Sequence, residues 1–376
     1  MRLMKIVVAA ALPVATFAAA VPVAHAAFRA TRTSAAPLPA PIYSSTLVGP
    51  GLASMYPVDV TQNASYYFVL DAGRFRVVAV DRSTGAISCQ VGGHQGSGPG
   101  QFGDARALDF DTATNQLYVA DTPNNRIEIF SFSATACAAG SSTGLTFVSQ
   151  FGSKGAGNEQ FNQVYGVAVD AVNGWVYAVD GAGRVEQSNL VGTYISQFNA
   201  GGTLNEPRQV SAAPNSDVLV LNARNHECDV FSSSGTLLFT FGSQGHGNGQ
   251  FTDDPRGVSV SQNGNLAFVT DSGGKRIEAF TLTSNGTNYS AATFAYTIAS
   301  GTGAAQFVGP RGLTTTADNH LLLTDEWGFG LHEFTFSPTG AMLTRNLFAT
   351  PPPIPGADSP RGLQVAANGQ IYIVDY

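Results

Sequence analysis

The residues best suited to chemistry are arginines that recur at one position of a repeated motif. Pro-Arg-Gly occurs at residues 255–257, 310–312 and 360–362, and related sequences place Arg106 and Arg208 at the same position. A guanidinium group stays charged and presents paired N–H donors that match a carboxylate, phosphate or sulfate. Arginines that recur in this way indicate an anion-binding site, provided that the fold brings them together.

The histidines are too scattered to indicate a zinc site. Beyond residue 26 the chain contains His94, His226, His246, His320 and His332. None of them shows the close spacing that is typical of a pair of zinc ligands. We therefore assign no catalytic residue and no metal ligand from these side chains.

The elements that must position the arginines are repeats. Short apolar runs end in an acidic residue, or once in asparagine, at Asp71, Asp121, Asp180, Asn222, Asp271, Asp325 and Asp375. We call these seven residues the landmarks; they are 42 to 59 residues apart, near the upper end of the range for propeller repeats. Polar turns separate about four short strands per unit, which predicts an all-β propeller with four-stranded blades.

Several repeated sequences carry a family resemblance. They are GSGPGQF at 96–102, GAGNEQF at 155–161, GHGNGQF at 245–251, YVADTPNNRIEIF at 118–130 and YGVAVD at 165–170. Over residues 50–376 the chain resembles the NHL-repeat β-propeller family, in particular its secreted bacterial type. The resemblance implies a propeller of NHL blades, usually six. The recurring Phe102, Phe161, Phe251 and Phe307 are expected to wedge between blades.

The resemblance also suggests two enzyme classes as alternatives. Some NHL propellers resemble peptidyl-hydroxyglycine amidating lyase, whose zinc-binding histidines lie at Pro-His-Gly or Pro-His-Ser positions, where this chain has Arg, Tyr or Val. Related lactonases bind calcium through axial Glu, Asn and Asp, for which the landmarks are candidates, although neighbouring arginines would oppose a cation. We expect no cofactor, with one axial calcium or zinc ion of a lyase or lactonase as the alternative.

The number of blades depends on both ends of the chain. Six units have all four strands, and the seventh stops at Tyr376 after its second strand. Residues 43–48 resemble an outer strand and are expected to close the ring beside the last two strands. We prefer seven blades, the last one incomplete, because a ring of six would leave the apolar residues 360–375 without a partner. Six blades are the alternative.

Antiparallel strands place the start of each innermost strand at one mouth of the central channel. The residues expected there are Val58, Arg106, Tyr165, Arg208, Arg256, Arg311 and Arg361, and all but Val58 form the candidate ligand-binding set. The structural alternative pairs each arginine with the landmark of its own blade, as a nearly neutral ring. Those pairs are Arg106–Asp121, Arg256–Asp271, Arg311–Asp325 and Arg361–Asp375. Arg208 is the best functional candidate, because its expected partner is the uncharged Asn222.

The amino-terminal sequence predicts export. Arg2 and Lys5 precede an apolar stretch, and Ala24-His25-Ala26 matches a cleavage site, so residues 1–26 are read as a signal peptide, with a retained anchor as the alternative. Residues 27–42 form a Pro/Ala-rich tether and 43–376 a single propeller domain. We expect a secreted or periplasmic protein with no membrane span after cleavage, in which Cys89 and Cys137 form a disulfide.

Composition narrows the function further. Only 12% of the residues are charged, and loss of Arg2 and Lys5 leaves 17 basic against 26 acidic residues, a formal charge of −9. This balance argues against nucleic-acid binding. The sequence therefore predicts a monomeric, non-catalytic recognition or scaffold module. Its expected partner is a protein, a glycan or a small anionic ligand, bound at the arginine-bearing mouth.

Overall fold

The computed structural model describes most of the repeat region. The described residues are 55–138, 142–299, 307–316, 320–328 and 330–336, together with four strands described by their backbone, Ile42–Thr46, Met342–Phe348, Pro360–Val365 and Ile371–Asp375. They all belong to one compact unit, Ala40–Tyr376. The predicted signal peptide and nearly all of the tether lie outside them. No helix among the described residues has the length and apolar character needed to cross a membrane.

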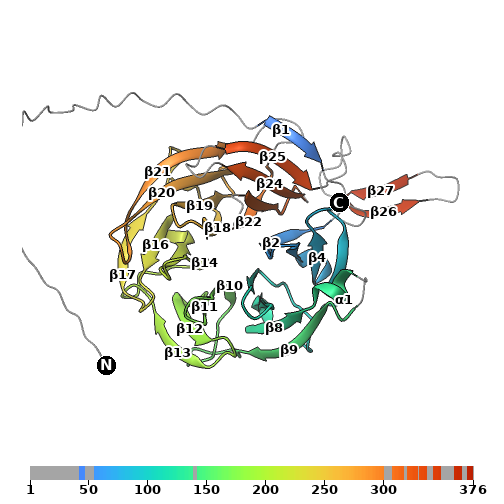
Figure 1. Ribbon diagram of the computed structural model, residues 1–376, viewed down its shortest axis with the longest axis horizontal. Helices are drawn as coiled ribbons and strands as arrows, with labels where there is room; N and C mark the ends of the chain where they lie inside the picture. The colour runs from blue at the N-terminus through green and yellow to red at the C-terminus, as the bar shows by residue number, and fades with distance from the viewer. Residues whose placement is uncertain are drawn as a thin grey trace, which may run out of the picture. The chain divides into compact units, whose positions relative to one another are not determined.

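Six antiparallel sheets of four consecutive strands form the blades (Figure 1). Blade 1 contains β2 (Pro57–Gln62), β3 (Tyr66–Asp71), β4 (Arg76–Asp81) and β5 (Ile87–Gly92). Blade 2 contains β6 (Ala107–Asp111), β7 (Gln116–Asp121), β8 (Arg126–Phe132) and β9 (Leu145–Phe151). Blade 3 contains β10 (Val164–Asp170), β11 (Trp175–Asp180), β12 (Arg184–Asn189) and β13 (Tyr194–Phe198).

The second half of the ring repeats this order. Blade 4 contains β14 (Pro207–Ala212), β15 (Val218–Asn222), β16 (Glu227–Phe231) and β17 (Leu237–Phe241). Blade 5 contains β18 (Pro255–Val260), β19 (Leu266–Asp271), β20 (Arg276–Ser284) and β21 (Tyr289–Ala299). Blade 6 contains β22 (Pro310–Thr315), β23 (His320–Asp325), β24 (Gly330–Phe336) and β25 (Met342–Phe348). One short α-helix, α1 (Ala134–Ala138), lies in the β8–β9 connection, and 3-10 turns follow β3, β7 and β15 at Ala72–Arg74, Thr122–Asn124 and Ala223–Asn225.

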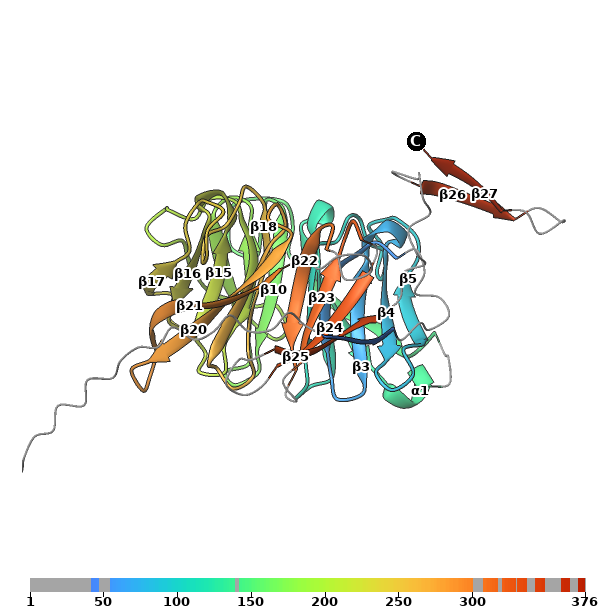
Figure 2. The ribbon, with the colours of Figure 1, turned by 90° about the horizontal axis from the view of Figure 1, so that it is seen from above.

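Burial explains the sequence pattern of each strand. The second strand of a blade is covered on both sheet faces by the neighbouring blades, so all six residues of β3 (YYFVLD) are buried. The outermost strands have one solvated face. In β13 (YISQF), exposed and half-buried residues therefore alternate. The strands run from one face of the ring to the other (Figure 2).

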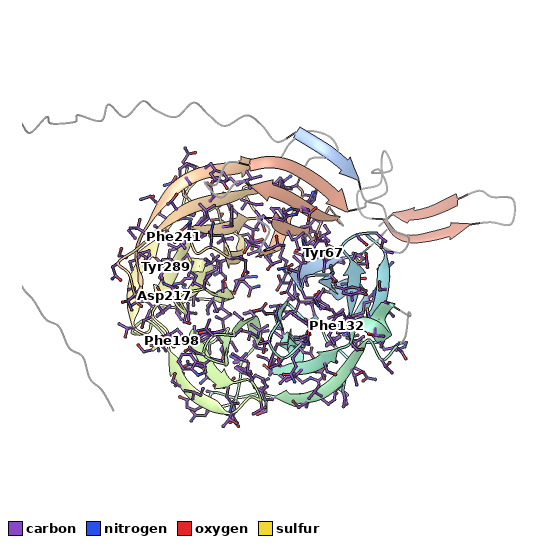
Figure 3. The ribbon with its side chains drawn as sticks, in the orientation of Figure 1. Tyr67, Phe132, Phe198, Asp217, Phe241 and Tyr289 are labelled. Carbon is purple, nitrogen blue, oxygen red and sulfur yellow. A yellow bond between two sulfur atoms is a disulfide. The ribbon has the colours of Figure 1, made fainter. Side chains whose placement is uncertain are left out.

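Aromatic side chains fill the gaps between blades. Phe132, Phe198 and Phe241, labelled in Figure 3, each pack against a ring of an adjacent blade. The pairs are Phe68–Phe132, Phe198–Phe231 and Phe241–Phe280, with ring centroids 4.9, 4.8 and 4.6 Å apart. The four phenylalanines expected to act as wedges, Phe102, Phe161, Phe251 and Phe307, are completely buried. They contribute to the core and present no stacking surface to solvent.

The preference for seven blades is wrong, and the ring closes with six. The innermost strand of blade 6, β22, contacts β2 of blade 1 directly. A Cβ atom at Gly312 would lie 2.5 Å from the Cα of Asp59, which leaves no room for another blade between them. The two last strands, β26 (Pro360–Val365) and β27 (Ile371–Asp375), form a separate two-stranded sheet.

The amino-terminal strand also has a different partner from the one expected. It forms β1 (Ile42–Thr46), which pairs in parallel with β25 and extends blade 6 to five strands. The ring is closed by contact between blades 6 and 1, so this strand is not needed to complete a blade. One hydrogen bond at this closure runs from the Tyr67 hydroxyl of β3 to Glu333 Oε1 of β24, over 2.6 Å (Figure 3 labels Tyr67).

A disulfide joins the first two blades. Cys89 on β5 is bonded to Cys137 in α1. The remaining cysteine, Cys228 on β16, is a buried free thiol. Cys228 packs among apolar neighbours of blades 4 and 5, as its small size and weak polarity favour.

Closure by six blades makes residues 351–376 dispensable for the ring. A chain ending at residue 350 should unfold in one cooperative transition with a melting temperature within about 2 °C of the full chain, because changes outside the core shift stability by only about 0.5 kcal/mol. Thermal unfolding followed by circular dichroism would check this. A chain ending at residue 328, which lacks two strands of blade 6, is the control that should not fold. A large loss of stability in the longer truncated chain would contradict closure by six blades.

Candidate functional site

A small cavity lies at one mouth of the channel. It has a volume of about 160 Å³ and is lined by Val58, Arg106, Tyr165, Arg208, Arg256 and Arg311, with Gln209 and Gly312 below them. The structure thus brings together six of the seven predicted positions. The exception is Arg361, which lies on β26 of the separate sheet. The expected mouth of five arginines is corrected to four, because the ring closes before that strand.

A β-bulge directs these side chains into the channel. In blades 1 and 4 the opening proline pairs with the landmark, and the register shifts before the third residue pairs. The residue between them, Val58 or Arg208, is therefore not paired in the β-ladder. The same shift occurs at the start of β10, β18 and β22. Such bulges bend a strand and re-aim a side chain, and they explain why this position lines the mouth in blades 1, 3, 4, 5 and 6. The β6–β7 pairing of blade 2 shows no such shift, and Arg106 directly precedes β6.

The landmarks bind elsewhere, so the predicted pairing with the mouth arginines is wrong. Asp121 Oδ1 accepts the backbone N–H of Gly103 (2.8 Å), and its Oδ2 accepts Arg126 Nε of the next strand (3.0 Å). Asp271 binds Thr252 N and Arg276 Nε in the same way. Arg126 and Arg276 lie directly opposite their landmarks in the ladder, which makes them the nearer partners.

Of the remaining predicted pairs, Arg311–Asp325 is also wrong, and Arg361–Asp375 stays a prediction. Asp325 accepts the N–H of Gly309 (2.7 Å) and lies 3.5 Å from His332, without an ion pair to Arg311. The side chains of Arg361 and Asp375 lie outside the described atoms. Asn222 donates to Asp229 Oδ2 (2.9 Å) and is not the partner of Arg208. The lack of charge on Asn222 therefore does not distinguish Arg208 from the other mouth arginines.

The mouth arginines pair instead with four other carboxylates. Three of these lie two residues earlier in the chain, in the pairs Arg106–Asp104, Arg208–Glu206 and Arg256–Asp254. The fourth is Glu326, whose Oε1 lies 2.5 Å from Arg311 Nη1 and 4.0 Å from Arg106 Nη1. The formal charges of these arginines and carboxylates therefore balance, but the strengths of their contacts are unequal.

Arg208 and Arg256 are the least satisfied cations of the mouth. Arg208 Nη2 is 3.8 Å from Glu206, beyond hydrogen-bond distance, and Arg256 Nε is 2.6 Å from Asp254 Oδ1. The Nε atoms of both arginines are buried and have no partner with hydrogen-bond geometry. The terminal Nη groups of both arginines donate no hydrogen bond to the residues that the structure describes. The Arg208 guanidinium lies over the ring of Tyr165, 5.8 Å from its centroid. Burial, followed by the charge of Arg256, lowers the pKa of Arg208.

The floor of the mouth is a hydrogen bond across the channel. Gln209 Nε2 of blade 4 donates to Asp59 Oδ2 of blade 1, on the opposite side of the ring, over 3.1 Å. The equivalent residues of the other blades are Ala107, Gly166, Gly257 and Gly312. Small residues there let the inner strands converge, and the two longer polar side chains fill the space between them. Burial raises the pKa of Asp59 to about 7, although three N–H groups donate to its carboxylate.

A second, larger cavity lies on the other side of this floor. Its volume is about 650 Å³, and the innermost strands of the blades line it. Asp109 lies in its wall, where its carboxylate accepts the Val169 N–H (2.8 Å) and the Thr61 hydroxyl (3.0 Å) of the two adjacent blades. Burial raises the pKa of Asp109 to about 6. Sequence reasoning missed Asp59 and Asp109. Asp59 is an acid where four of the other five blades have Ala or Gly, and Asp109 is an acid where the other blades have Thr, Ala or Ser.

The described part of the chain offers no ligand set for the axial metal of the enzyme alternatives. No three side chains of His, Cys, Asp or Glu are placed there to share a metal ion. His332 lies beside Asp325, and His320 contacts Glu333 at 2.6 Å, in blade 6. Arginines occupy the mouth positions where an axial metal would need anionic or neutral ligands.

Comparison with known proteins identifies the fold but no family. No protein-family model matches the chain, and no curated protein matches its sequence. Among solved structures, virginiamycin B lyase from Staphylococcus aureus is 13% identical, with 82% of this chain and 88% of that chain covered and a TM-score of 0.51. A catalytically inactive form of that lyase with quinupristin is 12% identical over 87% of this chain and 94% of that chain, with a TM-score of 0.52.

A third similar structure is the periplasmic gluconolactonase of Pseudomonas aeruginosa. It is 14% identical, with 78% of this chain and 89% of that chain covered and a TM-score of 0.53. At such identities the similarity shows only the β-propeller fold. The resemblance to NHL repeats in particular stays a prediction from the sequence.

Buried glutamates complete the landmark networks and make stability depend on pH. Glu128 lies 3.1 Å from Arg126, and its Oε2 has no hydrogen-bond partner. Burial raises its pKa to about 7, against 4.5 for an ordinary glutamate. Between these values the folded chain binds more protons than the unfolded chain. The free energy of unfolding should therefore fall as the pH rises through this window.

Replacing this glutamate should flatten the pH dependence. We expect the wild-type melting temperature to be lower at pH 8 than at pH 5.5, and Glu128→Gln to reduce that difference because the amide does not titrate. Thermal unfolding at both pH values measures it. Glu206→Gln, which neutralises a partly exposed carboxylate, is the matched control and should leave the difference unchanged. An identical slope in wild type and Glu128→Gln would refute this assignment.

Proposed function

We propose that the protein is a recognition propeller that binds an anionic group at the arginine mouth and performs no chemistry on it. The observation that carries this proposal is the pair Arg208 and Arg256. Both guanidinium groups line a concave site, and their terminal amines have no acceptor among the described residues. A carboxylate, phosphate or sulfate would supply that acceptor through charge-assisted hydrogen bonds.

The proposed partner is a small acid or an acidic group of a protein or glycan. A mouth of about 160 Å³ is smaller than the roughly 300–1,000 Å³ of sites for drug-sized ligands. Because the chain is acidic overall, the proposed partner is not a nucleic acid. We also propose that the chain acts as a monomer outside the cytoplasm, in the secreted or periplasmic space. The disulfide between Cys89 and Cys137 supports an oxidising compartment.

A lyase or lactonase activity is the second candidate function. The propellers of similar fold include virginiamycin B lyase and a gluconolactonase. In this chain, Asp59 and Asp109 have pKa values raised toward neutrality beside the larger cavity, a feature that active sites often share. Both carboxylates already accept backbone N–H groups of neighbouring strands, which favours a structural role. Turnover of quinupristin or gluconolactone, or one tightly held metal ion per chain, would favour the enzyme.

Removing Arg208 should weaken anion binding without unfolding the ring. We expect Arg208→Ala to weaken binding of inorganic phosphate and acetate by about tenfold or more, since a hydrogen bond to a charged group contributes roughly 1.5–3 kcal/mol. Isothermal titration calorimetry or nuclear magnetic resonance titration at constant ionic strength would measure the loss.

The matched control is Arg224→Ala. Arg224 is exposed, contacts the same Glu206 at 2.7 Å and lies outside the cavity lining. The change in net charge is therefore identical, but binding should persist. Equal affinity in Arg208→Ala and Arg224→Ala, or no binding of either anion by the wild type, would overturn the proposal.

A further inference from the structure

We infer that the arginine mouth selects a ligand with one anionic group, bound between Arg208 and Arg256, and that Glu326 is the residue that excludes a second anionic group. This inference rests on the proposed anion-binding function. It follows from an asymmetry between the two halves of the mouth, which the repeated sequence alone does not reveal.

The half formed by blades 6, 1 and 2 is already neutralised. Glu326 is 6% exposed at its side chain and lies 2.5 Å from Arg311 Nη1. The same carboxylate oxygen is 4.0 Å from Arg106 Nη1, so it faces both arginines of this half. Arg106 also pairs with Asp104. Burial, followed by the charge of the nearby Glu326 carboxylate, raises the pKa of Tyr56 to about 12.

The half formed by blades 3, 4 and 5 is open. Tyr165, Arg208 and Arg256 lie at the start of three consecutive innermost strands. Glu206 contacts Arg224 at 2.7 Å and lies 3.8 Å from Arg208, and Asp254 lies 2.6 Å from Arg256 Nε. Even so, the Nε atoms of Arg208 and Arg256 are both buried without a hydrogen-bond partner. An incoming anion would therefore meet two guanidinium groups whose terminal amines lack acceptors, beside an aromatic ring.

A second anionic group on the same small ligand has no comparable place. Glu326 does not line the cavity, but its carboxylate is close to Arg311 and Arg106, which do. A second anionic group at those two arginines would therefore come close to a carboxylate that already balances their charge, and like charges in a partly dry site repel strongly. To reach Arg311 it would have to displace an ion pair whose two members are 8% and 6% exposed. Breaking such a pair leaves a buried charge without a partner, which costs more than a surface contact returns. Glu326 therefore acts as a specificity-determining residue.

The experiment compares two acids with the same number of carbons. Butyrate carries one carboxylate and succinate carries two, and both fit a small cavity. For the wild-type chain at pH 7.5 and constant ionic strength, we expect butyrate to bind at least fivefold more tightly than succinate in a nuclear magnetic resonance titration. Glu326→Gln leaves Arg106 and Arg311 with less negative charge, and should shift the ratio at least tenfold toward succinate.

The control is Glu206→Gln, which neutralises a carboxylate of the open half and should keep the preference for butyrate. Circular dichroism of each variant checks that it is folded, and the wild-type comparison needs no variant. Tighter binding of succinate than of butyrate by the wild type, or an unchanged ratio in a folded Glu326→Gln variant, would overturn this inference while leaving anion binding intact. Failure of both acids and of phosphate to bind would overturn the proposed function itself.

Discussion

The structure depends on one hydrogen-bond arrangement that every blade repeats. The landmark at the end of the second strand accepts the backbone N–H that precedes the innermost strand, with N···O distances of 2.7 to 3.0 Å in all six blades. The other polar atom of the landmark side chain faces a residue of the third strand, which is usually an arginine. A buried carboxylate with these partners fixes where the innermost strand begins. The bulge that follows can then aim its residue into the channel without loosening the ring.

Blade 4 shows that the arrangement matters more than the residue types. There the landmark is Asn222, the residue opposite it is Glu227, and a second acid, Asp229, takes the place held by glutamate in blades 2, 3 and 5. The amide donates to Asp229, whereas the landmarks of blades 1, 2, 3 and 5 accept from arginine. The direction of hydrogen-bond donation is reversed, yet the Asn205 N–H still donates to Asn222 Oδ1 over 2.8 Å. The repeat thus conserves satisfied hydrogen bonds, by more than one set of side chains.

The sequence was sufficient for the class of fold and for the position of the mouth, because strand periodicity and the proline-led repeat are local signals. It was insufficient for the blade count and for the partners of the arginines. Closure depends on how nearly Gly312 approaches Asp59, and pairing depends on which side chains face each other across a ladder. Glu326 has no repeat signature, and Gln209 and Asp59 are 150 residues apart. Their contacts appear only when the ring is assembled.

The hydrogen bond between Asp59 and Gln209 has a consequence for the passage of molecules along the axis of the propeller. It spans the ring, and Gln209 lines both the cavity of about 160 Å³ and that of about 650 Å³. A molecule that moved along the axis from one cavity to the other would have to displace this hydrogen bond. Its loss would leave the buried Asp59 carboxylate with only the backbone N–H groups of Val60 and Leu108 as donors.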